Sequence, residues 1–378
     1  MNISKSPIVE IHGTGVHNRG AELMAIAISE KIKSVYPDAK IVVPCTFGSL
    51  SDIKNYGFWT SRTIESKRPK CLNTLFLSFI SGNTINVKDI DLVLDASGFA
   101  FSDQWGYGPA RKLFNKMNGS SRKGQPLILL PQALGSFKHE EVRSWAKKLF
   151  NRATVIFARD KQSFGFSNEI TEKKKLLKCP DFTINVQPLE KVSIALPEKF
   201  VSIVPNARML DKLEQNQQYL DFLKKSVDLI LANGLKPVFV IHDLHEDRNV
   251  VNLLGSQYSN VLIIQDNDPR VLKWILGKSQ FVIGSRFHAL VSSLSQGVPC
   301  IGAGWSHKYP ELFEDFNNFE GLISNLSDFK ALEKQISELS DDNQRALRAQ
   351  NISAAAQILK SQVNEMWDVV LNQISRNI

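Results

Sequence analysis

The sequence predicts an α/β protein with two Rossmann-like, doubly wound domains that face each other across a cleft. Short apolar runs of strand length alternate with amphipathic runs of helix length along most of the chain. This alternation starts twice, near residue 7 and again near residue 200. At 378 residues, with 43% hydrophobic and 22% charged residues, the chain is large and apolar enough for two full-sized cores.

The first series of elements predicts an N-terminal domain over residues 1–187. Its expected strands are 7–11, 41–44, 91–94, 127–130 and 154–157, and its expected helices are 21–35, 139–150 and 161–166. The segment 50–88 has no clear alternation, and we expect an irregular or helical insertion there. Open α/β sheets bind ligands beyond the carboxyl ends of their strands. The loops 12–20, 95–99 and 159–160 are expected at such ends.

The second series predicts a C-terminal domain over residues 188–350 and a closing helix within 351–378. Its expected strands are 201–204, 237–241, 261–264, 281–283 and 300–303, and its expected helices are 217–233, 269–277, 287–296, 326–347 and 352–374. No internal repeat or low-complexity tract interrupts this order.

The strand, turn and helix over 281–296 form the strongest candidate site. Gly284 ends the strand, Ser285 is the expected N-cap of the helix, and Gly297 is its expected C-terminal glycine. Such a unit directs backbone N–H groups and the positive end of a helix at one point. The segment therefore predicts an anion-binding site.

Two side chains beside that point add chemistry to the site. Arg286 can bind a carboxylate or phosphate with two parallel hydrogen bonds, and His288 can carry a proton near neutral pH. An arginine at a helix start is more often a simple surface ion-pair residue. Its position at the end of a strand, next to a titratable histidine, favours anion binding coupled to proton transfer.

The net charge of +8 is unevenly distributed. Residues 1–185 contain 27 basic and 16 acidic residues, which gives +11, and the remainder contains 19 and 22, which gives −3. A basic first half predicts an acidic partner, such as an anionic glycan, a lipid diphosphate or a membrane surface. Nucleic acid is disfavoured because no recognition motif is present. A basic cluster that could touch a membrane precedes the apolar run 75–80, and its members are Lys67, Arg68 and Lys70.

The four cysteines are scattered and form no C-x-x-C pair, so neither a zinc site nor a disulfide framework is expected. The first residues lack the apolar core of a signal peptide, and no apolar run approaches the roughly 20 residues of a membrane span. These features favour a cytoplasmic protein, with the inner face of the membrane as a place where a lipid-linked partner could be met.

Several motifs occur in the order seen in a known family. They are G-S-R-F-H-A-L at 284–290 with G-V-P-C-I-G at 297–302 and Lys308, N-R-G-A-E at 18–22, the Pro-Gln at 131–132, the Arg-Asp at 159–160 with Ser163, and the Pro-Asp at 180–181. With these motifs the chain resembles the polysaccharide pyruvyl transferase family over about residues 8–310. One departure is Ala96-Ser97-Gly98, where many members have three glycines.

The resemblance implies transfer of a pyruvyl group from phosphoenolpyruvate to a sugar of a surface or capsular polysaccharide or its precursor, giving a pyruvate ketal. It also implies a fold similar to GT-B glycosyltransferases. The expected partners are phosphoenolpyruvate as co-substrate and a free or lipid-linked glycan; no metal or other cofactor is needed. The roles it implies are His288 as acid or base, Arg286, Arg159, Ser285 and Lys308 for the donor, and Asn18, Glu22, Asp95 and Gln132 for the acceptor.

Two other functions remain open from the sequence. One is a GT-B-type glycosyltransferase that uses a nucleotide sugar, since an anion-binding helix would also suit a diphosphate. Against it, Gln296 stands where an acidic residue would hold ribose hydroxyls. The other is a glycan-binding assembly subunit without catalytic activity. The structural roles also remain open: Arg159-Asp160 could be an ordinary helix-initiating pair, and Asn18 and Glu22 could only cap a helix.

Overall fold

The computed structural model describes residues 6–62, 83–122, 124–212, 216–243, 245–304 and 306–378. The chain forms two compact units. Unit 1 consists of residues 1–17, 24–182 and 362–378, and unit 2 of residues 18–23 and 183–361. The chain thus passes from one unit to the other at 182/183, close to the expected boundary at 187/188. Two features had no sequence signal: the short segment 18–23 groups with unit 2, and the last helix is divided between the units.

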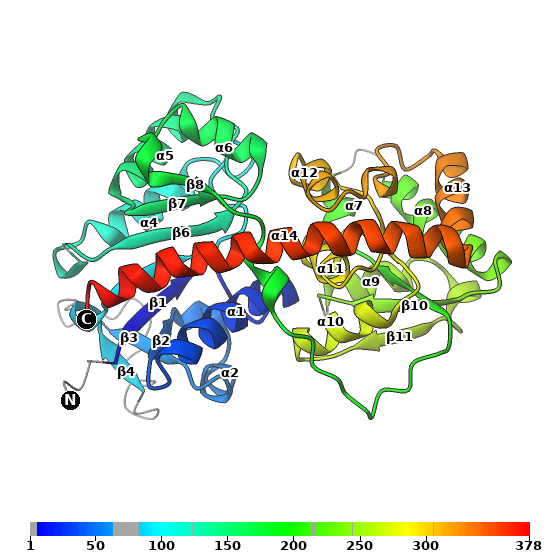
Figure 1. Ribbon diagram of the computed structural model, residues 1–378, viewed down its shortest axis with the longest axis horizontal. Helices are drawn as coiled ribbons and strands as arrows, with labels where there is room; N and C mark the ends of the chain where they lie inside the picture. The colour runs from blue at the N-terminus through cyan, green and yellow to red at the C-terminus, as the bar shows by residue number, and fades with distance from the viewer. Residues whose placement is uncertain (1–5, 63–82, 123, 213–215, 244, 305) are drawn as a thin grey trace. The chain divides into compact units, whose positions relative to one another are not determined.

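In the described part of unit 1, eight strands form one parallel sheet in the order β4-β3-β2-β1-β5-β6-β7-β8 (Figure 1). The strands are β1 (Ile8–His12), β2 (Lys40–Val43), β3 (Trp59–Arg62), β4 (Thr84–Asn86), β5 (Leu92–Asp95), β6 (Leu127–Gln132), β7 (Val155–Ala158) and β8 (Leu176–Lys178). Every strand expected in this half is present.

The expected insertion at 50–88 is partly wrong. The helix α2 (Leu50–Asn55) is present, but β3 and β4 then extend the sheet. These strands were missed because they are short, polar and half-exposed at the sheet edge, so they lack an apolar run. The basic cluster and the apolar run 75–80 lie outside the described residues.

The helices of unit 1 are α1 (Arg19–Val35), α2, α4 (Gly108–Met117), α5 (Glu140–Arg152) and α6 (Lys161–Asn168). The first turn of α1 groups with unit 2 and the rest with unit 1. Helices α4 and α5 pack against one face of the sheet through small and apolar side chains such as Leu113 and Leu149. The sequence did not predict α4, which begins with Gly108 and Pro109 and has four polar or charged side chains among its ten residues.

Unit 2 contains a five-stranded parallel sheet in the order β11-β10-β9-β12-β13. Its strands are β9 (Phe200–Val204), β10 (Lys236–Ile241), β11 (Leu262–Gln265), β12 (Val282–Gly284) and β13 (Cys300–Gly302). Side chains of β9 alternate between two cores: Val201 and Ile203 face one, and Phe200 and Val204 face the other. The sheet is therefore buried on both faces, as expected for parallel strands.

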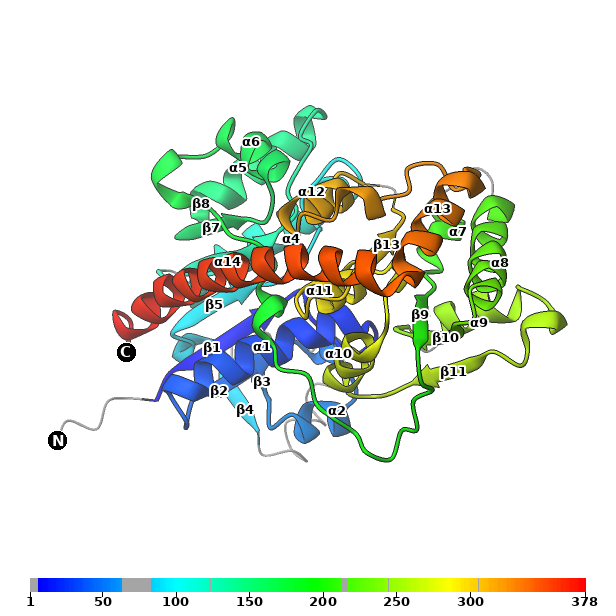
Figure 2. The same cartoon turned by 45° about the vertical axis from the view of Figure 1, so that its right-hand side comes forward.

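Helices cover the two faces of this sheet. They are α7 (Arg208–Lys212), α8 (Asn216–Ala232), α9 (Glu246–Asn252), α10 (Pro269–Lys278), α11 (Phe287–Leu294), α12 (Lys308–Asp315), α13 (Phe329–Ser340) and α14 (Asp342–Ser375). Residues of α8, α9 and α13 line one core, and residues of α10, α11, α12 and α14 line the other. Figure 2 shows α8 and α13 side by side.

The C-terminal helices differ from the expectation. The prediction of one helix over 326–347 and a second helix from 352 is wrong, because α13 ends at Ser340 and α14 begins at Asp342. The first turns of α14 are polar and largely exposed, so they lack the apolar period that marks a helix start. Among the described residues, no helix has the length and hydropathy needed to cross a membrane.

Each sheet changes its direction of winding beside its first strand. In unit 1 this point lies between β1 and β5, where His12 and Asp95 are register partners. In unit 2 it lies between β9 and β12, where Val204 and Gly284 are register partners. Doubly wound sheets bind ligands at such switch points. The residues that follow these strands are therefore the candidates for function.

Candidate functional site

The candidate site of unit 2 lies at the carboxyl edge of the sheet, where the adjacent strands β10, β9 and β12 end. His242 follows β10, Asn206 follows β9, and Ser285 follows β12. The carbonyl oxygen of Ser285 accepts hydrogen bonds from Asn206 Nδ2 at 2.7 Å and from the Tyr309 hydroxyl at 2.9 Å. All of these side chains are buried. The turn before α11 is therefore held rigidly.

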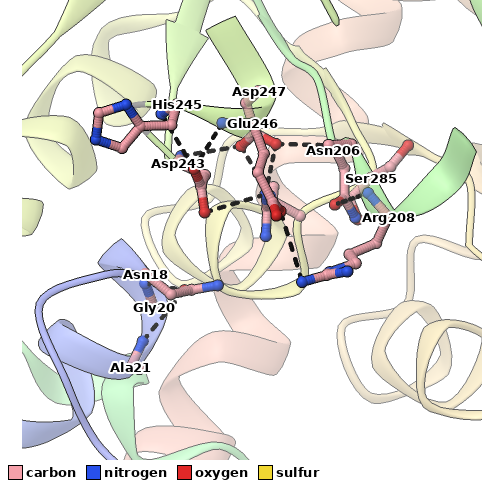
Figure 3. A network of polar contacts seen from close by, with 12 residues as sticks. Asn18, Gly20, Ala21, Asn206, Arg208, Asp243, His245, Glu246, Asp247 and Ser285 are labelled. Atoms are coloured by element: carbon pink, nitrogen blue, oxygen red, sulfur yellow. Dashed lines mark hydrogen bonds and ion pairs between the residues drawn. The ribbon is translucent and has the colours of Figure 1, made fainter. Parts of the chain in front are cut away.

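Asp247, in the first turn of α9, joins the loops that follow all three strands. Its Oδ1 accepts a hydrogen bond from Ala207 N at 3.0 Å, and its Oδ2 accepts one from Asp243 N at 2.9 Å. Both oxygens also bind Arg286, with Nε at 2.8 Å from Oδ2. Figure 3 shows Asp247 among Asp243, Asn206 and Ser285. The carboxylate thus fixes the geometry of the whole edge.

Arg286 uses its two-pronged face to bind Asp247, and Asp243 lies 3.9 Å from Nη2. This differs from the expectation that both prongs face a ligand. Burial alone would lower the pKa of Arg286, but Asp247 and Asp243 raise the pKa above its ordinary value, so the guanidinium stays charged. No hydrogen bond within the described part of the chain uses Nη1, which is the nitrogen available for an anion.

The prediction that Ser285 is the N-cap of α11 is wrong. The helix begins at Phe287, its N-cap is Arg286, and no side chain caps it. The turn is fixed through the Ser285 carbonyl, so the hydroxyl is not needed for capping. Ser285 is 1% exposed, and its Oγ makes no hydrogen bond of good geometry with the described residues, although the Tyr219 hydroxyl lies close enough to interact with it. A buried, unpaired hydroxyl is destabilising, and a ligand oxygen would satisfy it.

The first turn of α1 packs against His288. A Cβ atom on Gly20 would lie 2.3 Å from His288 Nδ1, so only glycine permits this approach. Asn18 Oδ1 accepts the Gly20 N–H at 2.8 Å, and Figure 3 shows Asn18 beside Gly20 and Ala21. Arg19 binds the buried carboxylate of Glu22. Asn18 and Glu22, expected in acceptor binding, thus lie in unit 2 and support this turn.

His242 was not predicted as a site residue. It is 6% exposed, and its Nε2 has no hydrogen-bond partner within the described part of the chain. Burial, followed by the charges of Arg286, His288 and Arg19, lowers the pKa of His242 to about 3. The imidazole is therefore neutral at physiological pH and surrounded by cationic or titratable groups.

Lys308, a predicted donor residue, is half-buried in α12 with Nζ 5.3 Å from the rings of Phe287 and Tyr309.

A second candidate site lies at the switch point of unit 1. Asp95 ends β5, is 2% exposed, and accepts hydrogen bonds from Gln132 Nε2 at 3.2 Å and from Ser97 Oγ at 3.0 Å. Burial raises the pKa of Asp95, against the opposing effects of His12 and these hydrogen bonds. The structure therefore brings the predicted residues Asp95 and Gln132 together and adds His12 beside them.

A buried charged network lies beneath this site. Glu10 on β1 is fully buried and contacts Arg122 at 2.5 Å, Lys116 at 3.1 Å and His12 at 3.4 Å. Burial alone would raise the pKa of Glu10, but His12 and the two cations lower it below its ordinary value. The side chain of His12 is 12% exposed, so it joins this network to the edge of the sheet.

The predicted donor residue Arg159 lies in unit 1. Its Nη1 binds Asp181 Oδ2 at 3.2 Å, and its backbone N–H donates to Gln132 O. Asp160 is the N-cap of α6, with Oδ1 accepting the Ser163 N–H at 2.7 Å. The motifs at 131–132, 159–163 and 180–181 thus meet in unit 1, while Ser285, Arg286, His288 and Lys308 lie in unit 2.

Sequence reasoning missed Asn206, His242 and Asp247. The signal for the first two was available, because each is polar and lies within two residues of the end of an apolar strand. Asp247 had no comparable signal, since its role depends on contacts with residues up to 40 positions away along the chain.

The model of the polysaccharide pyruvyl transferase family matches residues 18–307. The chain belongs to this family. The match includes the site residues discussed above in unit 2 except Lys308 and Tyr309, and those of unit 1 except Glu10 and His12. No curated protein sequence matches the chain.

Solved structures with the same architecture are distant in sequence. The S. aureus MnaA–UDP structure has a TM-score of 0.57 and 14% identity, covering 93% of this chain and 94% of its own. UDP-GlcNAc 2-epimerase from Neisseria meningitidis, bound to UDP-GlcNAc, also has 0.57 and 14%, with 95% and 100% covered. The glycotransferase of kitacinnamycin has 0.51 and 12%, with 97% and 99% covered. These likenesses show the fold alone, two parallel-sheet α/β domains of the GT-B type.

Proposed function

We propose that the protein transfers a pyruvyl group from phosphoenolpyruvate to a sugar of a surface polysaccharide or its precursor, forming a pyruvate ketal. Family membership supports a transferase that acts on polysaccharide. The observation that carries the donor assignment is the start of α11. There a buried hydroxyl without a partner, a charged guanidinium and the open first turn of a helix occur together.

Phosphoenolpyruvate suits this site because it carries two acidic groups. The phosphate would bind at the first turn of α11, with Ser285 Oγ and Arg286 Nη1 as donors. His288, in the first turn of the same helix, would exchange the proton. Lys308 would add positive charge nearby. The donor role of Arg159 rests on the family resemblance alone, because its guanidinium is held in a buried ion pair with Asp181 in unit 1.

The reaction balances without a redox step. A sugar hydroxyl adds to C2 of the enol phosphate, its proton is taken up by a base, and C3 receives a proton to become a methyl group. Phosphate then leaves from C2, and a second hydroxyl adds there and loses its proton. The products are the ketal and inorganic phosphate. Positioned acid–base catalysis typically contributes about 10²–10⁴-fold to such steps.

We assign the acceptor to unit 1. Asp95 and Gln132 provide buried polar groups at its switch point, and the basic excess of residues 1–185 would attract an anionic or lipid-diphosphate acceptor. Asn18 and Glu22 are reassigned to the support of the donor site, because they cap α1 and bind Arg19.

Two measurements test this function. Phosphoenolpyruvate, but not uridine or guanosine diphosphate, should raise the melting temperature, because binding to the native state alone stabilises it. Inorganic phosphate should then be released from phosphoenolpyruvate when a suitable sugar acceptor from a panel is added. Stabilisation by a nucleotide diphosphate instead would favour the glycosyltransferase alternative. Glycan binding without phosphate release would favour an assembly subunit.

A further inference from the structure

We propose that His242 is a donor-binding residue whose ring N–H donates a hydrogen bond to the carboxylate of phosphoenolpyruvate, while Ser285 and the start of α11 bind its phosphate. This inference rests on the proposed function and adds a residue to it.

The first argument is the position of His242. It stands one residue beyond β10, and Ser285 stands one residue beyond β12, with β9 between these two strands. Neighbouring strands are about 4.8 Å apart, so the two backbones are roughly 10 Å apart at this edge. Side chains that extend inward from both sides shorten this span. A small molecule with two acidic groups can therefore contact both residues.

The second argument is the lack of hydrogen bonding. Among the described residues, His242 Nε2 and Ser285 Oγ are both buried without a partner. Native proteins leave few buried polar atoms unsatisfied, because each one destabilises the folded state. The two atoms flank the same strand end, so one ligand would satisfy both.

The third argument is the surrounding charge. The ring of His242 lies near Arg286 at the start of α11, His288 in α11 and Arg19 at the start of α1. The carboxylates in these surroundings are already engaged: Asp247 holds Arg286 and Glu22 holds Arg19, while Asp243 lies 3.9 Å from Arg286. Burial, followed by the positive charges of Arg286, His288 and Arg19, lowers the pKa of His242, so the imidazole is uncharged and offers one N–H without adding another repulsive cation. The positive charges around His242 favour a ligand carboxylate at this position.

The test compares two ligands by isothermal titration calorimetry on the full-length protein. Phosphoenolpyruvate carries both acidic groups, whereas inorganic phosphate carries only one. His242→Phe keeps a flat ring and removes the donor, so it should weaken phosphoenolpyruvate binding by roughly ten- to a hundredfold and leave phosphate binding unchanged. Ser285→Ala should weaken both ligands. His245→Gln, an exposed change three residues away, should weaken neither.

A rescue variant identifies the atom. His242→Gln can place an amide N–H near the position of Nε2, so it should recover part of the lost affinity. His242→Phe also removes a buried unsatisfied polar atom, so it should fold and be at least as stable at pH 7.

The outcomes separate the two proposals. Failure of the wild-type protein to bind phosphoenolpyruvate would overturn both. Normal binding by His242→Phe, or an equal loss for phosphate, would overturn the role of His242 and leave the proposed function intact. An unfolded His242→Phe protein would contradict the claim that the imidazole gains its hydrogen bond only from a ligand, since the role of His242 would then be structural.

Discussion

Replacement of Asp247 by Asn tests whether one carboxylate fixes the candidate donor site. Asp247 is fully buried and accepts hydrogen bonds from Arg286 Nε and Nη2, from Ala207 N and from Asp243 N. An Asn side chain keeps one acceptor oxygen and turns its NH₂ group toward two of these donors. The substitution therefore breaks a buried ion pair and leaves buried donors unpaired.

The expected loss of stability is about 3–5 kcal/mol, the usual range when one partner of a buried ion pair is removed. A protein of two units need not unfold in one step, so a single unfolding curve is not sufficient. Hydrogen exchange measures the effect locally, because the amides of Ala207 and Asp243 bind different oxygens of Asp247 and Asn keeps only one of them. One of these two amides should therefore exchange faster, together with the start of α9. Phosphoenolpyruvate affinity should fall at least tenfold as Arg286 loses its anchor.

Two controls make this test decisive. Asp228→Asn makes the same chemical change on an exposed position of α8 and should alter stability by less than about 0.5 kcal/mol. Arg286→Lys, which cannot reproduce the two-pronged contact, should cause much of the same loss, so the double variant should be less than additive. A stability loss under about 1 kcal/mol with unchanged phosphoenolpyruvate affinity would refute the reasoning.

Three further predictions follow from the same geometry. Gly20→Ala should displace the His288 ring, lower the free energy of unfolding by about 1–3 kcal/mol and lower kcat. Gly165→Ala, with open space around the added methyl group, should have none of these effects. Equal kcat values in both variants would contradict the contact between Gly20 and His288. His242 has a pKa of about 3 in the folded protein and an ordinary pKa of 6.5. At a pH between these two values, the imidazole therefore takes up a proton when the protein unfolds. Acidification below pH 6.5 should therefore reduce the stability of the wild-type protein, and His242→Phe should reduce that slope by up to about 1.4 kcal/mol per pH unit; identical slopes in urea titrations would exclude this. Replacement of the basic cluster by glutamine should raise the acceptor KM at low salt and leave the phosphoenolpyruvate KM unchanged, since charge steering is screened beyond about 8 Å at physiological salt. Acceptor kinetics without that shift would show that the cluster does not attract the acceptor; its members are Lys67, Arg68 and Lys70.

Local patterns in the sequence determined most of the elements. A parallel strand buried on both faces reads as a short apolar run, so strands such as β6, β9 and β10 were recognisable. Their spacing by helices indicated two doubly wound sheets. Polar residues directly after the strands then pointed to the carboxyl edges. Both inferences need only neighbouring residues, which is why the sequence was sufficient for them.

Tertiary structure decided how the candidate site is assembled. The strand order places β9, the first strand of unit 2 in the sequence, at the centre of its sheet, and this brings Asp247, Asn206 and Ser285 together from three loops. The Ser285 hydroxyl is left unpaired because its carbonyl, held by Asn206 and Tyr309, fixes the turn. The segment 18–23 joins unit 2 because Gly20 allows α1 to approach His288. These contacts link residues far apart along the chain, and periodicity carries no information about such distances.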